Sequence, residues 1–244
     1  MVTNPMQQFE VYKIGPEISI GTVNLSFTNS SLFMVISASL ILLLLFLGTK
    51  KKYLIPSKIQ LITEMSYTFV AKMINDTAGS SAKAFFPFIF TLFMFVLFLN
   101  LVGMLPYSFT VTSHIIVTFI LASIVFVGVT IIGFIKHGIK YLQLFVPKGV
   151  PILLLPLIVV IEIISYLSRP VSLSVRLFAN MMAGHTMLKV FGGFVISLGL
   201  LGGWLPLGFS VALTGLEILI AFLQAYVFAI LTCIYLNDAL NLHH

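Results

Sequence analysis

The chain has 244 residues, of which 59% are hydrophobic and only 8% are charged. A soluble domain carries about a quarter charged residues, so this composition excludes a soluble globular protein and indicates an integral membrane protein. The net charge of +6 does not indicate nucleic-acid binding. The cationic residues are scattered among hydrophobic runs, where the positive-inside rule for membrane proteins accounts for them.

Three apolar runs in the first part of the chain predict membrane helices. They cover residues 31–49, 84–105 and 115–135. Each run is about long enough to cross the hydrocarbon core of a bilayer as an α-helix.

The distribution of positive charge predicts how these helices are oriented. The segments 50–83 and 136–148 hold six and three of the thirteen Lys and Arg residues, so we expect both on the interior side. The polar N-terminus, residues 1–30, is then exterior, and it lacks the charged and apolar regions of a cleavable signal peptide. Residues 58–78 mix charged and apolar side chains, which predicts an amphipathic helix on the interior surface.

The last third of the chain predicts a hairpin of two unusually long helices, 151–190 and 206–241. At the rise of an α-helix they measure roughly 60 and 50 Å, against a hydrocarbon core of roughly 30 Å. The sequence GGWLP at 202–206 lies between them and favours a break. Because few charges are available to solvate the excess length, we expect both helices to be steeply tilted. The whole chain, 1–244, is thus expected to be one all-α membrane domain.

Each hairpin helix carries a stripe of polar residues. On the first helix the members share an arc of about 80°: Glu162, Ser165, Arg169, Ser172, Arg176 and Asn180. His185 falls on the opposite side of that helix. On the second helix the polar residues also share one side: Glu217, Gln224, Tyr235 and Asp238.

Two interpretations of these stripes stay open. Polar groups on packed membrane helices often satisfy one another, which is sufficient for the serines. For Arg169, anchoring at the membrane interface is an equal alternative. Arg176 differs, because a central arginine costs at least about 2.5–3.5 kcal/mol in a bilayer. We therefore expect Arg176 to face a partner or a water-filled path.

Titratable residues approach Arg176 from both directions along the helix axis. Glu162 lies roughly 21 Å before it and His185 roughly 13 Å after it. A guanidinium does not release its proton, so it forms a barrier to proton movement. This arrangement favours two half-paths separated by Arg176. No carboxylate lies beside Arg176 on its own helix, so a partner would have to provide one.

The motifs that carry these residues closely resemble those of subunit a of F-type ATP synthases, the proton-channel subunit. The resemblance rests on SRPVSLSVRLFANMMAGH, LEILIAFLQAYVFAILTCIYLNDA, NLVGMLPYSFTVTSH and LIPSK, and covers nearly the whole chain. It implies that Arg176 faces the membrane-buried carboxylates of a rotating ring of c subunits and prevents a short circuit between the two proton paths. Asn180 and Gln224 match the positions around this arginine.

The resemblance also implies two half-channels. The positions that match the outer half-channel are His185, Glu217 and Asn100. The positions that match the interior half-channel are Glu162, Ser168, Ser172 and Tyr235. Gly103 stands where some bacterial relatives have an acid, which leaves the outer path more dependent on His185 and Glu217. His114 has two open interpretations, a residue that tunes proton entry and a solvated loop residue.

By the same resemblance the chain is a non-catalytic subunit with no cofactor and no metal site. Its implied partners are the c-ring, the b subunits of the peripheral stalk, other ATP synthase subunits and lipid, with no nucleic acid. A bacterial inner membrane is expected, with the mitochondrial inner membrane as the alternative. The alternative function is a secondary transporter with a midplane polar site, which would favour two matching halves that the sequence lacks. An intramembrane hydrolase is the weakest alternative, because neither G-x-S-x-G nor H-E-x-x-H occurs and no nucleophile–base pair is evident.

Overall fold

The computed structural model describes residues 9–15, 19–20, 23–24, 26–50, 55–105, 108–146 and 154–241. Its α-helices are α1 (Asn29–Lys50), α2 (Lys58–Ala78), α3 (Phe86–Gly103), α4 (Ile115–His137), α5 (Leu155–Gly202) and α6 (Trp204–Leu240). Three 3-10 segments accompany them: η2 (Ser80–Phe85), η3 (Val111–Ser113) and η4 (Gly138–Phe145). Near the N-terminus the strands β1 (Ser19–Ile20) and β2 (Val23–Asn24) form a short antiparallel pair.

The described residues are nearly all helical, which confirms the predicted fold class. Five helices are long and apolar enough to cross a membrane, and α2 is not among them. The ends of α1, α3 and α4 lie within two residues of the predicted spans, and α2 has the bounds predicted for the amphipathic helix. Residues 1–8 of the predicted exterior segment and 151–153 of the predicted hairpin lie outside the described residues.

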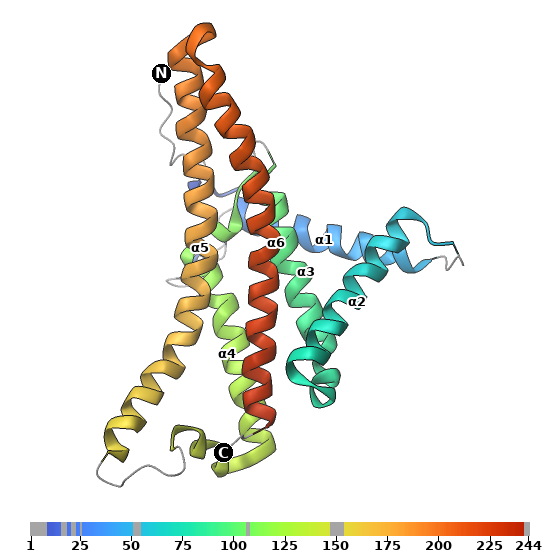
Figure 1. Ribbon diagram of the computed structural model, residues 1–244, viewed down its shortest axis with the longest axis vertical. Coiled ribbons are helices and arrows are strands. Elements are labelled where there is room, and N and C mark those ends of the chain that lie inside the picture. The colour runs from blue at the N-terminus through green and yellow to red at the C-terminus, as the bar shows by residue number, and fades with distance from the viewer. Residues whose placement is uncertain are drawn as a thin grey trace.

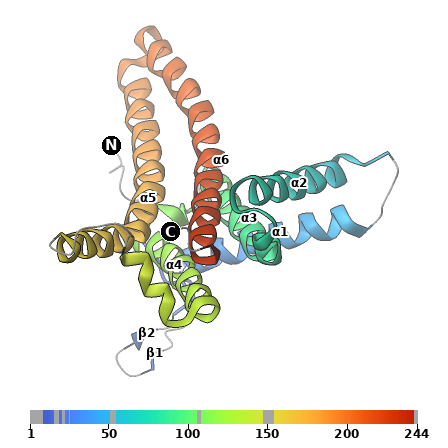
Figure 2. The same ribbon diagram turned by 60° about the horizontal axis from the view of Figure 1, so that its bottom comes forward.

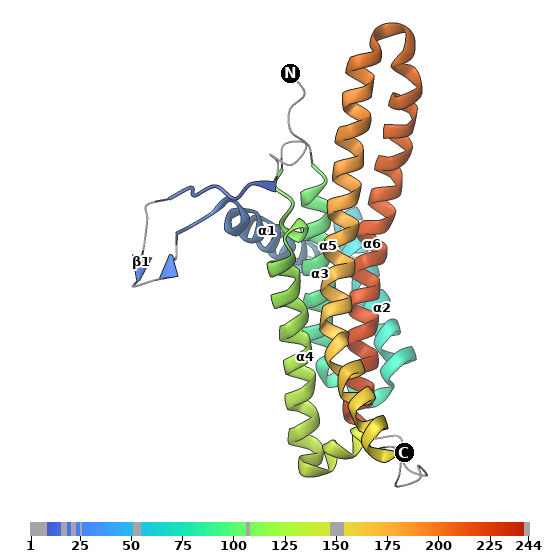
Figure 3. The ribbon, with the colours of Figure 1, turned by 90° about the vertical axis from the view of Figure 1, so that its left-hand side faces the viewer.

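Four helices form the body of the fold, and the other two project from it. α3, α4, α5 and α6 lie side by side, with α6 in contact with each of the other three (Figures 1 and 3). α1 and α2 pack against each other and extend together from one side of this bundle (Figure 2). The ends of α5 and α6 that join each other extend beyond the rest of the bundle (Figure 3).

Small side chains explain how α6 fits among α2, α3, α4 and α5. Ala221, Ala225 and Ala229 are completely buried and follow one another at intervals of four residues. This spacing places them on one face of the helix. Small residues on such a face allow helix backbones to approach closely, which is how membrane helices gain packing energy without a hydrophobic driving force.

The C-terminal end of α6 is held by the last turn of α4. Lys136 donates a hydrogen bond from Nζ to the carbonyl oxygen of Leu240, at 2.9 Å, and His137 Nε2 lies 3.1 Å from the same oxygen. The carbonyl ends of a helix carry partial negative charge, so a cation there is favourable. These contacts join the ends of α4 and α6 on the side that the lysines predict to be interior.

The hairpin forms as predicted, but its first helix is longer than the sequence suggests. α5 continues past the expected end at Val190 to Gly202, and α6 begins at Trp204 instead of residue 206. Gly199 has a φ of 60° and is the one non-helical residue inside α5. The glycines after Val190 weaken the helix preference, but the apolar residues between them continue the pattern, so the helix runs on to the kink at Gly199 and the chain reverses between Gly199 and Trp204.

Pro170 lies inside α5, so the assumption of one straight helix from Glu162 to Asn180 does not hold. Proline removes a backbone donor and clashes with the preceding turn, which kinks a helix. In Figure 2 the first part of α5, in yellow, turns away from the orange remainder. The predicted polar stripe is therefore divided into a part before the bend and a part after it.

Candidate functional site

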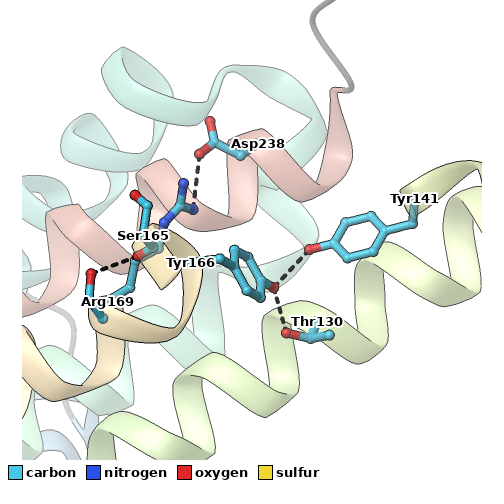
Figure 4. Close-up of polar contacts among 7 residues, drawn as sticks. Thr130, Tyr141, Ser165, Tyr166, Arg169 and Asp238 are labelled. Carbon is cyan, nitrogen blue, oxygen red and sulfur yellow. Dashed lines mark hydrogen bonds and ion pairs between the residues drawn. The ribbon is translucent and has the colours of Figure 1, made fainter. Parts of the chain in front are cut away.

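The polar residues of the hairpin separate into two clusters, with Arg176 between them along α5. The first cluster lies where α5 meets α4, η4 and the end of α6 (Figure 4). Tyr166 is its centre: its hydroxyl lies 2.7 Å from Thr130 Oγ1 and 3.0 Å from Tyr141 Oη.

The hydroxyl groups of this cluster form a row of hydrogen bonds that all point the same way. Thr130 donates its only hydroxyl hydrogen to the carbonyl oxygen of Phe126, at 2.8 Å. The hydroxyl of Tyr166 must then donate to Thr130, and the hydroxyl of Tyr141 to Tyr166. Since a main-chain carbonyl terminates the chain, it is a saturated structural network rather than a route for protons. Tyr141 fits against α4 because Gly133 lacks a Cβ, which would collide with the tyrosine ring.

Arg169 belongs to the same cluster and does not reach away from it. Its Nη1 lies 3.4 Å from Asp238 Oδ2, across α5 and α6 (Figure 4). Its guanidinium also lies over the rings of Tyr166 and Tyr235, at 5.2 and 5.0 Å from their centroids. Cation–π contacts of this kind stabilise a partly buried arginine. The structure thus pairs Arg169 with Asp238 of the neighbouring helix.

The cluster encloses very little space. A cavity of about 10 Å³ is bordered by Tyr141, Tyr166, Arg169, Tyr235 and Asp238 with three apolar side chains. A volume of this size accommodates about one water molecule. The cavity can therefore hold one water molecule between the guanidinium of Arg169 and the tyrosine hydroxyl groups.

Three of the residues assigned to the interior half-channel lie apart from this network. Ser168 is exposed, and its hydroxyl donates to the carbonyl oxygen of Ser165 at 2.7 Å, within the helix. Ser172 is also exposed, and Glu162 is half-buried. Only Tyr235 contacts the cluster, through Arg169.

Arg176 is exposed at the surface of the hairpin. Within the described part of the chain it makes no hydrogen bond or ion pair, and its electrostatic interaction is with Tyr235. One turn further along α5, Asn180 donates from Nδ2 to Gln224 Oε1 at 3.1 Å. Gln224 is buried, and its Nε2 has no hydrogen-bond partner among the described residues. The structure thus brings Asn180 and Gln224 together beside an arginine that no carboxylate of the described chain neutralises.

The second cluster surrounds Glu217, on the side of the bundle where η3 lies. Glu217 is only 9% exposed, and neither carboxylate oxygen has a hydrogen-bond partner among the described residues. Gly184 of α5 makes room for it, because a Cβ at that position would collide with the carboxylate. Asn100 of α3 is fully buried and donates to the carbonyl oxygen of Ala221, one turn after Glu217, at 3.4 Å.

His185 joins this cluster to the turn after α3. Its Nε2 lies 3.2 Å from the hydroxyl of Thr110, which donates its hydrogen to the carbonyl oxygen of Gly103 at 3.1 Å. The hydroxyl can then only accept from the imidazole, so Nε2 carries a hydrogen and Nδ1 is the basic nitrogen of the neutral ring. Thr110 also packs 3.0 Å from the position of a Cβ on Gly103, so it fills the space that an acid at that position would need.

Sequence reasoning missed several residues of both clusters. Thr110 and Gly184 lie beside predicted residues, yet nothing in their spacing indicates a contact. Thr130, Tyr141 and Tyr166 come from three separate elements and form no local motif. The structure brings His185 and Glu217 onto facing helices, with Asn100 close by. Each of the first two groups can bind and release a proton. The structure places Arg176 outside both clusters.

Known proteins identify the family of this chain. The profile of the family described as ATP synthase A chain matches residues 31–237. The chain is 79% identical over 244 residues to ATP synthase subunit a of Pelagibacter ubique, covering all of both chains. It is 60% identical over 250 residues to ATP synthase subunit a of a Chelativorans species, again covering all of both. The protein of the same name from Mesorhizobium japonicum is 58% identical, with 99% of this chain and 98% of the relative covered. The chain therefore belongs to the ATP synthase A chain family.

Proposed function

We propose that this membrane protein is the proton-translocating stator subunit of an F-type ATP synthase. The observation that carries the proposal is the position of Arg176, exposed on an apolar hairpin between two polar clusters. A central arginine costs at least about 2.5–3.5 kcal/mol in a bilayer, so a partner or water must compensate its charge. The described chain supplies no carboxylate for that purpose, which supports carboxylates on a partner as its counter-charges.

Those carboxylates would belong to a ring of c subunits that moves past the hairpin. Each carboxylate would be neutral while it faces lipid and would ionise near Arg176, because an opposite charge favours the ionised form. Arg176 would also block direct passage of protons, since its own proton is not released. Asn180 and Gln224, joined by a hydrogen bond, would flank the point where a carboxylate meets the arginine.

Two paths would bring protons to the ring and remove them. The outer path would use Glu217, His185 and Asn100, which the structure gathers at the η3 side of the bundle. The interior path would use Tyr235, with Glu162, Ser168 and Ser172 along α5. The exposed serines are suited to hold water on that side, while the saturated chain of Tyr141, Tyr166 and Thr130 would form the path's closed wall.

Other parts of the assignment follow from the same role. The chain would be non-catalytic by itself and would work with the c-ring, the b subunits of the peripheral stalk and the remaining synthase subunits. The bacterial relatives support location in a bacterial inner membrane. The N-terminus would then face outward and the lysine-rich segments inward.

The test is the substitution Arg176→Ala in the complete synthase in membrane vesicles. We expect loss of ATP-driven proton pumping, with the amount of assembled complex close to that of the unsubstituted protein. Val175→Ala is the matched control, because Val175 is the preceding residue and is 42% exposed. Normal ATP-driven pumping by vesicles that carry Arg176→Ala would overturn the proposal.

A further inference from the structure

The turn between α3 and α4 is polar and yet buried, which is unusual for a loop. Thr110, Thr112 and Ser113 are at most 4% exposed. η3, which lies inside this turn, contacts α1, α3, α4 and α5. Loops normally run over the surface, because buried polar groups must find partners. A polar segment in this position needs a function that its burial serves.

Several polar atoms in and below this turn lack hydrogen-bond partners among the described residues. In the turn they are Thr112 Oγ1 and His114 Nε2, and deeper in the bundle they are Asn100 Oδ1 and both carboxylate oxygens of Glu217. Thr112 and Asn100 are 1% and 0% exposed. Buried polar groups are nearly always satisfied by protein or by ordered water, and a buried water makes about three hydrogen bonds. A succession of such atoms is therefore suited to bind a file of water molecules.

The residues that carry these atoms are linked partly by short steps along the chain and partly by contacts between elements. His114 lies four residues after Thr110, whose hydroxyl contacts His185 Nε2 at 3.2 Å. Gly184, next to His185, lies against Glu217. From His114 the turn leads to the Thr110–His185 contact, and Gly184 leads to the buried carboxylate. Because the Thr110 hydroxyl donates its hydrogen to the carbonyl oxygen of Gly103, the protein groups alone form no continuous route, and water molecules must join them.

His114 stands at the outer end of this series of groups. Its ring stacks on Phe109, with centroids 5.1 Å apart and an interplanar angle of 19°. The main chain of Phe9, in the N-terminal segment, hydrogen-bonds the same ring. Burial lowers the pKa of His114 below its ordinary value, and the hydrogen bond that the ring gives to the main chain of Phe9 opposes this effect only in part. The imidazole is therefore neutral at neutral pH and able to accept a proton.

Charged groups near the turn are few. Among the described residues, the N-terminal segment carries Glu10 and Lys13, and α5 carries His185 and Lys189 on the side of the turn. α3 has no charged residue, α1 has only Lys50 at its far end, and the basic residues of α4, Lys136 and His137, lie in its last turn. Among the described residues of the turn, His114 is thus the one titratable group.

We propose that His114 is the entry relay of the outer proton path. It accepts a proton from the outer medium and releases one to the water file that leads to His185 and Glu217, returning to the neutral form. This assignment rests on the proposed function, because it adds an outer residue to the path that serves the c-ring. It also gives the N-terminal segment a role, since the main chain of Phe9 hydrogen-bonds the ring of the relay.

The test is His114→Gln in the complete synthase, in inverted vesicles whose internal pH sets the pH of the outer side. ATP synthesis driven by a fixed membrane potential is measured as a function of that internal pH. We expect synthesis about tenfold slower, which is below the 10²–10⁴ of acid–base catalysis because water can partly bypass the relay. Rates are divided by the amount of assembled complex. His114→Ala with imidazole added inside the vesicles should recover much of the rate.

Two controls separate a relay from a structural role. His137→Gln changes a histidine at the opposite end of α4 and should leave the dependence on outer pH unchanged. Thr112→Val keeps the shape of the side chain and removes its hydroxyl; it should also slow synthesis, and it serves as the test if His114→Gln does not assemble. Wild-type rates and pH profiles in the assembled His114 and Thr112 variants would overturn the relay. If Arg176→Ala abolishes pumping while these variants behave as wild type, the relay fails and the proposed function stands.

Discussion

Gly184 lets Glu217 occupy its buried position, and Gly184→Ala tests this contact directly. An added Cβ would lie 3.0 Å from Cδ and 3.1 Å from Cγ of Glu217, and it would collide with a carboxylate oxygen. Such overpacking typically costs about 1–3 kcal/mol. Alanine is otherwise favoured over glycine inside a helix by roughly 0.5–1 kcal/mol, so we expect a net loss of about 1–2 kcal/mol in the free energy of unfolding.

The effect on transport should be larger than the effect on stability. The carboxylate must move away from α5, and a displacement of about 1 Å in a reacting group can cost up to 10²-fold in rate. The assay is ATP-driven proton pumping in vesicles, with the thermal stability of the detergent-solubilised complex measured on the same variants. Adding Glu217→Asp, which shortens the side chain by one methylene, should recover part of the stability lost in Gly184→Ala.

Gly192→Ala is the matched control, because it lies in the same helix and a Cβ there has nothing within 4 Å. It should leave pumping unchanged and stability equal or slightly higher. Unchanged pumping and stability in Gly184→Ala would refute the steric reasoning. Equal losses in both variants would also refute it, since the cause would then be glycine in α5 generally.

Two further predictions concern the interior and outer ends of the bundle. Gly133→Ala should lower the free energy of unfolding by about 1–3 kcal/mol, because the added Cβ would collide with the ring of Tyr141. Gly128→Ala should not lower it, because a Cβ at that position has no atom within 4 Å. Thermal unfolding in detergent measures both variants. The pKa of His114 in the folded protein lies below its ordinary value of 6.5, so the unfolded chain binds the proton first and stability should fall as pH drops from about 6.5 through the lowered pKa. Thermal unfolding between pH 5 and 8 should show this slope, and a slope that His114→Gln leaves unchanged would contradict it.

The helices were predictable because their signal is local. An apolar run of the length of a bilayer has few alternatives to a membrane helix, and GGWLP places the reversal of the hairpin within a few residues. The end of α5 was less predictable. Gly192 and Gly193 do not end the helix among residues that remain apolar, so it continues past Val190 until Gly199, whose φ of 60° interrupts it.

Only those site residues that share one face of a single helix could be predicted from the sequence. The helical projection identified the residues that mark the hairpin, but it could not include the bend at Pro170. Contacts between segments that are far apart in the sequence could not be predicted from it. Tyr166 meets Thr130 and Tyr141 from elements 36 and 25 residues away, and Arg169 meets Asp238 across 69 residues. Such pairs depend on how helices rotate against one another, which composition and periodicity do not determine.

The hydrogen bonds from Lys136 and His137 to Leu240 have a mechanical consequence. They clamp one end of the hairpin to α4, while the joined ends of α5 and α6 extend beyond the bundle without that support (Figure 3). The hairpin is thus fixed to the bundle at one end and free at the other. A lateral load applied near Arg176 would pass along α6 into the clamped end, and the free tip could bend without displacing the clamp. A part that must stay still beside a moving ring would gain its stiffness from this fixed end rather than from its length.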